Sequence, residues 1–188
     1  ARDDLFVGAE ATWRDLDAHF IDTTTDQAVT ADHEEQTHRL YLNWAATDRV
    51  AVSTELVYDL FEARRSTLTV EDLFPERVDT FSLPLRVRWF APSGVFAGAG
   101  ATLVHQNVRR SRDNALGLAD GDDSFVVLDA AIGYRLPNRA GVISLEVNNL
   151  LDNGFRYQDD SFREFRDTPT IGPFIPERQV LLRLTLNW

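Results

Sequence analysis

The chain of 188 residues contains no cysteine, no methionine and no lysine, and it has no long apolar run. The lack of cysteine excludes disulfide bridges, thiolate metal sites and cysteine nucleophiles. Because the chain lacks methionine and starts with Ala1, we expect a processed or truncated product with no signal peptide left to read. No segment approaches the about 20 apolar residues that a membrane-spanning helix requires. A membrane protein remains possible, because a barrel strand needs only about 9–11 residues with alternate ones apolar.

The charge balance is strongly acidic. The net charge is −11 and the pI is about 4.7, from 30 acidic residues against 19 basic ones, all of them arginine. Nucleic-acid-binding proteins usually present a basic surface, so we expect no nucleic-acid partner. The exclusive use of arginine has two explanations that stay open, namely genome composition and a need for always-charged, bidentate donors. The mean hydropathy of −0.26 fits a barrel and also fits a soluble protein.

Apolar residues alternate with polar ones along several segments, which is the pattern of β-strands with one apolar face. The last segment shows it best, and its apolar face holds Val180, Leu182, Leu184, Leu186 and Trp188. We predict an all-β fold, an antiparallel transmembrane β-barrel segment of about eight strands in one domain over 1–188. The predicted strands are 5–20, 37–46, 49–61, 79–90, 95–106, 125–136, 141–151 and 178–188. Pro84 removes a backbone donor inside a strand, which predicts a bulge or a sheet edge there.

The connections alternate in length. Pro, Gly and Asn supply the chemistry of tight turns at 46–49, 91–94 and 137–140. The predicted long loops are 21–36, 62–78, 107–123 and 152–176. This alternation is typical of bacterial outer-membrane barrels, in which the short turns are periplasmic and the long loops extracellular; an even strand number then places both termini in the periplasm. A β-propeller also has turns about every 45 residues, but its blades need four short strands and each period here holds two long ones.

Aromatic residues are predicted to lie at two levels. Just before the tight turns, or at the end of the chain, lie Trp44, Trp89, Tyr134 and Trp188. Near the long loops lie Tyr58, Phe61, Phe155 and Tyr157. Amphipathic rings at one level form a girdle at the lipid headgroups of a barrel. In a soluble β-sandwich, no physical effect would place the aromatic residues of different strands at the same height.

The other face of the predicted strands is charged. It holds Glu10, Arg39, Asn43, Glu55, Asp59, Arg86, Arg88, Asp129, Arg135, Glu146, Asn148 and Arg183. Each of these side chains would be costly in lipid, so we expect them to face a lumen. Two interpretations stay open, a self-compensating network that holds the wall together and a track for a charged or polar solute.

No catalytic, cofactor or metal motif is present in the sequence. It lacks Gly-x-Ser-x-Gly, a P-loop and His-Glu-x-x-His, and His105 with a nearby serine has no supporting motif. The stretch 120–123 could bind a hard cation through oxygen ligands, but it lacks the EF-hand pattern and is interpreted as a solvated loop. No metal-binding spacing relates the four histidines, His19, His33, His38 and His105. We therefore expect no enzyme, no catalytic residue, no cofactor and no metal.

Three segments near the C-terminus carry a family resemblance, namely Val126–Leu136, Leu145–Asp152 and the ending 176–188. They resemble, in this order, the antepenultimate strand, the penultimate "N-L-F-D" segment and the closing strand of TonB-dependent outer-membrane receptors. The resemblance implies that the terminal aromatic residue and the alternate leucines before it are read by the barrel-assembly machinery, namely Leu182, Leu184, Leu186 and Trp188. The segment Phe90–Phe96 also resembles a turn in outer-membrane barrels fused behind tetratricopeptide repeats.

The resemblance covers the last third of the chain well and the rest in general style only. Receptors of this family have about 22 strands and a plug in the lumen, whereas this sequence predicts about eight strands and no plug, and position 151 is Leu in place of the usual Phe. The implied function is uptake of a scarce solute across the outer membrane of a Gram-negative bacterium. The implied partners are outer-membrane lipid and lipopolysaccharide, the assembly machinery, and an energy-coupling periplasmic partner that acts through an N-terminal region absent here.

Two alternatives stay open. One is a barrel fused to helical repeats that exports or passes polysaccharide, for which an arginine-bearing lumen is suited. The other is a complete eight-stranded structural or adhesive barrel, whose interior would be filled by side chains.

Overall fold

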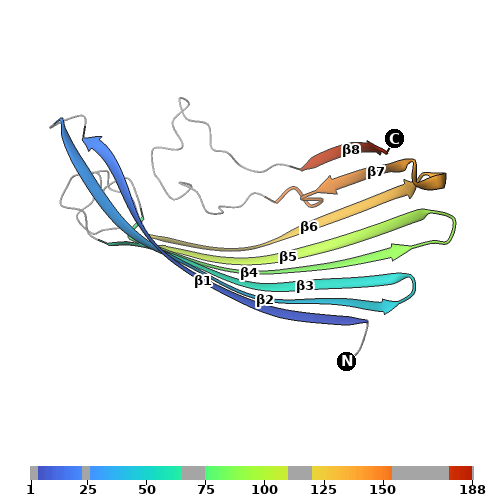
Figure 1. The fold of residues 1–188 in the computed structure, drawn as a ribbon, viewed down its shortest axis with the longest axis horizontal. Helices are drawn as coiled ribbons and strands as arrows, with labels where there is room; N and C mark the ends of the chain where they lie inside the picture. Colours follow the sequence, from blue (N-terminus) through green and yellow to red (C-terminus); the bar gives the residue numbers. More distant parts are fainter. Residues whose placement is uncertain (1–3, 23–25, 65–74, 110–119, 154–177, 188) are drawn as a thin grey trace.

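The computed structural model describes residues 4–22, 26–64, 75–109, 120–153 and 178–187. They form one antiparallel sheet of eight strands in sequence order (Figure 1). The strands are β1 (Leu5–Asp22), β2 (Gln27–Thr47), β3 (Val50–Arg64), β4 (Arg77–Phe90), β5 (Val95–Arg109), β6 (Gly121–Arg135), β7 (Gly141–Asn148) and β8 (Gln179–Leu186). A 3₁₀ turn, Pro137–Arg139, joins β6 to β7. The predicted all-β antiparallel fold is confirmed. Within the described ranges, no helix is long and apolar enough to cross a membrane.

The sheet is open. β1 and β8 form its two opposite edges and do not pair with each other (Figure 1). The described strands therefore do not close into a ring by themselves, and the barrel that the sequence predicts is not formed by these eight strands alone.

Three short connections lie at the same end of the sheet, as predicted. β2 and β3 meet with Thr47 opposite Val50. Between β4 and β5, the Gly94 amide donates to the Ala91 carbonyl at 3.1 Å. Gly94 has a φ of +97°, and a Cβ there would lie 2.9 Å from the carbonyl oxygen of Arg135, so this turn requires glycine. All three short turns thus fix the adjacent strands as hairpins.

The first predicted loop is mostly strand. β1 and β2 stay paired as far as Asp22 opposite Gln27, so β2 begins well before its predicted start at 37. Toward this end of the hairpin both faces carry polar side chains, including the facing pair Asp15 and Glu34. Alternation between apolar and polar residues disappears where both faces meet water, although backbone pairing continues. The prediction of a loop over 21–36 was therefore wrong.

Pro84 causes neither a bulge nor an edge. β4 lies inside the sheet between β3 and β5, and its register with β3 is the same on both sides of the proline. The ladder is interrupted only where Leu83 would face Leu56 and Pro84 would face Glu55. The missing N–H thus leaves a local gap in an otherwise continuous pairing.

Cross-strand register sorts the side chains onto two faces, because directly opposed residues lie on the same side of a sheet. One face, called the apolar face below, carries most of the large hydrophobic side chains that are exposed in the structure. They are Leu5, Val7, Trp13, Leu40, Trp44, Phe81, Leu85, Val87, Trp89, Leu103, Val126, Ile132, Tyr134, Ile143, Leu145, Val180, Leu182, Leu184 and Leu186. The opposite side is called the polar face.

The sheet has almost no core of its own. Among the described residues, the buried hydrophobic side chains are Leu60, Val104 and Val108. The strands make their main contacts with their neighbours in the sheet, and no second layer of described structure covers the apolar face. A water-soluble domain usually buries such a face against another layer.

Candidate functional site

The polar face gathers the charged residues that the sequence assigned to a lumen. Register links them in rows across the sheet, for example Glu10 with Arg39, and Arg86 with Asp129 through Gly100. The residues that the sequence assigned to a lumen all lie on this face, namely Glu10, Arg39, Asn43, Glu55, Asp59, Arg86, Arg88, Asp129, Arg135, Glu146, Asn148 and Arg183.

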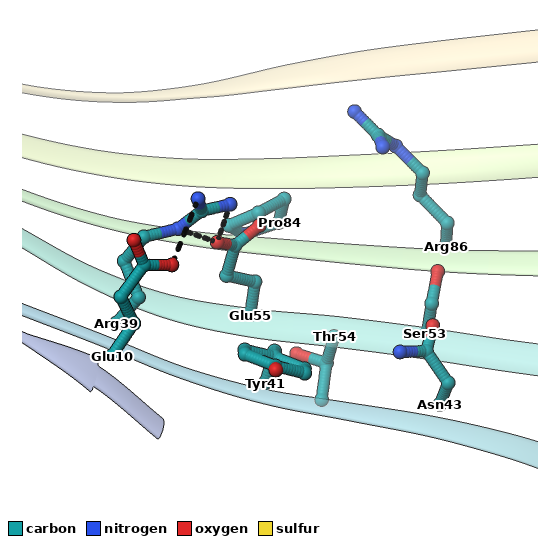
Figure 2. A pocket seen from close by; sticks show the side chains of 9 residues that line it. All are labelled: Glu10, Arg39, Tyr41, Asn43, Ser53, Thr54, Glu55, Pro84 and Arg86. Carbon is teal, nitrogen blue, oxygen red and sulfur yellow. Dashed lines mark hydrogen bonds and ion pairs between the residues drawn. The ribbon is translucent and has the colours of Figure 1, made fainter. Parts of the chain in front are cut away.

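Several of these charges compensate one another. Arg39 forms an ion pair with Glu55, and a second with Glu10 at 3.7 Å (Figure 2). At the other side of the sheet, Arg183 lies 3.2 Å from Glu146. All these groups stay partly exposed, so each pair contributes little to stability by itself. These pairs bring opposite charges together around Arg39 and Arg183.

Other charged groups on this face are held by neutral partners. The Thr37 hydroxyl donates to Asp59 at 2.8 Å, and the Asn149 amide donates to Asp129 at 3.0 Å. The Arg135 guanidinium lies 5.4 Å from the centre of the Phe90 ring, within the range of a cation–π contact.

A hollow of about 410 Å³ lies on the polar face over β1 to β4 (Figure 2). It is lined by Glu10, Arg39, Tyr41, Asn43, Ser53, Thr54, Glu55, Pro84 and Arg86. Its size is in the range of small-molecule sites. The sequence analysis did not single out the Tyr41 ring, although its odd position on β2 was enough to place it beside Arg39 and Asn43.

Figure 2 shows two different ends of this hollow. Arg39, Glu10 and Glu55 form one cluster joined by ion pairs, whereas Arg86 stands apart with Asn43 and Ser53 as its nearer neighbours. Within the described residues, no carboxylate forms an ion pair with Arg86.

The apolar face carries aromatic residues at the level of the tight turns. Trp44, Trp89 and Tyr134 all lie on it, near the ends of β2, β4 and β6. The fourth predicted member, Trp188, lies outside the described residues.

A second aromatic row crosses the apolar face toward the long loops. In register across β2 to β6 it contains His38, Tyr58, Phe81, His105 and Ser124. Of this row, only Tyr58 is predicted at this level from the sequence.

Phe61 lies near the long-loop end of β3, the level given for it from the sequence. Its side chain is on the polar face, where its ring centre is 5.4 Å from that of His33. Phe155 and Tyr157 lie outside the described residues.

A cluster of charges follows the second aromatic row on the same face. The Arg77 guanidinium donates two hydrogen bonds of 2.8 Å to Asp79, and Arg77 also lies 3.4 Å from Glu62. The hydrogen bond from Arg77 is the main cause that lowers the pKa of Asp79 below its ordinary value, and the Tyr58 hydroxyl adds to it. The apolar face therefore carries charged side chains immediately beyond the second aromatic row, on the side of the long loops.

His105 and Ser124 are hydrogen-bonded at 2.7 Å between Nδ1 and the hydroxyl. A nucleophilic serine needs its histidine oriented by a third group and an oxyanion site nearby. In the part of the chain that the structure describes, no carboxylate is bonded to His105, and no group of three metal-ligating side chains gathers. The pair is therefore best described as part of the second aromatic row.

The leucines assigned to barrel assembly lie on the sheet edge. Leu182, Leu184 and Leu186 share the apolar face of β8 and are 74%, 58% and 51% exposed. Trp188 falls outside the described residues.

Comparison with family models, with curated proteins and with solved structures found no match to this chain.

Proposed function

We propose that this chain is part of the wall of an outer-membrane transport barrel, similar to TonB-dependent receptors, that takes up a scarce polar solute. The observation that carries the proposal is the division of one sheet into a continuous apolar face and a charged face. In this arrangement lipid covers the apolar face, and the solute passes along the polar one. The wall of a membrane barrel is a single β-sheet whose outer face is apolar and whose inner face is polar.

The height of the apolar band supports a bilayer as its surrounding. Between the two aromatic levels, the apolar face of β4 runs from Trp89 to Phe81 through Val87, Leu85 and Leu83. A tilted barrel strand needs about 9–11 residues to cross the hydrocarbon core, and this stretch matches that length. Charge appears only past Phe81, where headgroups and water would begin.

The open edges favour a barrel with more strands over a closed eight-stranded one. A bilayer does not tolerate an unpaired sheet edge, because its backbone N–H and C=O groups would find no partner in hydrocarbon. β1 and β8 do not pair with each other. In the proposed barrel each of them pairs with a strand outside these eight.

Two neighbouring positions on β5 test the sidedness. Ala101 lies on the apolar face and Thr102 on the polar face, at the same depth. Because the chain has no cysteine, Ala101→Cys and Thr102→Cys each introduce one thiol. In intact outer membranes, a water-soluble maleimide should label the cysteine at 102 quickly and the one at 101 slowly. Equal labelling of both, or the reverse order, would exclude a lipid-facing apolar side.

Transport is tested by growth of the bacterium with and without the protein. A panel of carbon, nitrogen, phosphorus and metal sources is supplied at growth-limiting concentrations. We expect an advantage on at least one source, lost when a bulky maleimide modifies the cysteine at 102 and retained when it modifies the one at 101. If no source reveals an advantage, the transport proposal fails, even if the labelling pattern supports a membrane barrel.

A further inference from the structure

We propose that Arg86 and Arg88 form a binding site for a solute that carries two oxyanion groups, carboxylates or phosphates. The inference deepens the proposed function and rests on the polar face being the solute path. It names the chemistry of the solute that this face would hold. Its first support is an imbalance of charge at one place on that face.

The arginines of the polar face fall into two groups. Arg14 is paired with Glu35, Arg39 with Glu55, and Arg183 with Glu146. Arg135 lies over the Phe90 ring. Arg86 and Arg88 have neither kind of partner among the described residues. In a chain with 30 acidic and 19 basic residues, two adjacent uncompensated cations are unexpected.

The acidic groups nearest in register are already engaged. Glu55, close to Arg86 in the hollow, is bound by Arg39. Asp129, in the same row as Arg86, accepts the Asn149 amide at 3.0 Å. Glu146, in the same row as Arg88, accepts the Ser144 hydroxyl and the Arg183 guanidinium. Within the described residues, none of these carboxylates forms an ion pair with Arg86 or Arg88.

Small residues surround the two arginines and leave room for a ligand. Arg86 stands between Ser53 and Gly100, and Arg88 between Ala51 and Gly98. A Cβ on Gly100 would lie 3.5 Å from Cγ of Arg86, and one on Gly98 would lie 3.6 Å from Cγ of Arg88. Both arginine side chains therefore lie close over glycine backbone.

The spacing of the pair suits a solute with two anionic ends. Residues two apart on a strand point to the same side and are separated by about 7 Å. Each guanidinium can hold one carboxylate or phosphate through two parallel hydrogen bonds, which lysine cannot do. Asn43 and Ser53 line the hollow beside Arg86 and can hydrogen-bond the body of the solute. Both arginines are exposed on the open face, so a ligand can reach them.

The test measures binding of two probes to the full native protein in lipid vesicles at low ionic strength. Pyrophosphate carries two phosphate groups, glutarate carries two carboxylates, and glucose serves as a neutral control. The variants are Arg86→Gln, Arg88→Gln, the double variant, and Arg86→Lys with Arg88→Lys. Arg139→Gln is the matched control, because Arg139 lies in the exposed turn between β6 and β7.

We expect at least one dianion to bind to the wild-type protein. Each single Gln variant should raise the dissociation constant about tenfold or more, because charge-assisted bidentate hydrogen bonds are lost. The lysine variants should fall between wild type and the Gln variants, and Arg139→Gln should match wild type. As a second readout, the bound probe should slow modification of Arg86 and Arg88 by phenylglyoxal, and glucose should not. Pyrophosphate binding alone would indicate phosphate-bearing solutes, and glutarate binding alone would indicate carboxylates.

Failure of this inference is distinct from failure of the proposed function. If neither dianion binds, or if the double Gln variant binds as well as wild type, the oxyanion site is refuted. If the maleimide labelling and the growth advantage remain in that case, the transport proposal still holds and the solute is of another class. If the dianions bind through both arginines but no growth advantage exists, the site stands and transport fails.

Discussion

A charge placed on the apolar face should destabilise the folded protein far more than the same charge placed one residue away. The test substitutions are Ala101→Arg on the apolar face and Thr102→Arg on the polar face. Both positions lie on β5, face Leu85 and Pro84 of β4 respectively, and are about midway between the two aromatic levels. They add similar volume at the same depth, so they differ mainly in the surrounding of the new charge.

The expected magnitude follows from that surrounding. The row of Ala101 on the apolar face contains Leu42, Thr54, Leu85 and Leu128, with no charged member. An arginine facing lipid at the midplane costs about 2–4 kcal/mol in membrane barrels, which is a change of about 30-fold to 1,000-fold in the folding equilibrium. A substitution on a face that meets water usually stays within about 0.5 kcal/mol.

Urea-induced unfolding of the native protein from lipid vesicles measures both values. The intrinsic fluorescence of Trp44 and Trp89, which lie on the apolar face, reports the loss of the lipid surrounding. We expect the free energy of unfolding to fall by about 2–4 kcal/mol in Ala101→Arg and to change little in Thr102→Arg. If the two variants lose the same stability, or if Thr102→Arg loses more, then the apolar face does not contact lipid.

Three further substitutions address separate parts of the sheet. The lowered pKa of Asp79 beside Arg77 means that its contribution to stability is complete above its ordinary pKa of about 4 and is lost as pH falls through the lowered value. Asp79→Asn should therefore flatten the fall in unfolding free energy below about pH 4, and unchanged slopes in acid titrations would contradict this. Glu55→Gln should cost less than about 1 kcal/mol, because the pair with Arg39 is partly exposed; urea titrations should show the cost vanishing at high salt, and a salt-independent loss would argue against an ion pair. Pro84→Thr restores a backbone donor where the ladder is interrupted and should raise the unfolding free energy by about 0.5–1.5 kcal/mol, whereas a decrease would show that the proline ring itself supports the sheet.

The sorting of residues between the two faces could be predicted from the sequence because it requires only the period of a strand. Leu85 and Val87 alternate with Arg86 and Arg88, and this parity does not depend on which strand lies beside β4. The same reasoning placed the charged residues that were assigned to a lumen on one face. For Phe61 only the level along the strand was predicted, and its parity places it on the polar face.

The ends of the strands could not be predicted in the same way. The hairpin of β1 and β2 continues to Asp22 and Gln27, but where residues 14–17 pair with residues 32–35 both faces are mainly polar. Apolar and polar residues alternate along a strand only where its two faces have different environments. Where both faces meet water, the sequence shows no such alternation. Backbone hydrogen bonds that hold such a segment leave no pattern in the side chains.

The contacts within the candidate site depend on register, which composition does not reveal. β2 and β3 meet through a register shift between Ala45 and Thr47. Beyond this shift Arg39 faces Val57 and thus lies on the side of Glu55. Had the pairing of Thr47 with Val50 continued without the shift, Arg39 would face Tyr58 on the apolar face, since a slip of one residue exchanges the two sides of a strand. One extra residue beside a tight turn therefore keeps the charges of β2 and β3 on a common face, and the division between the faces depends on it.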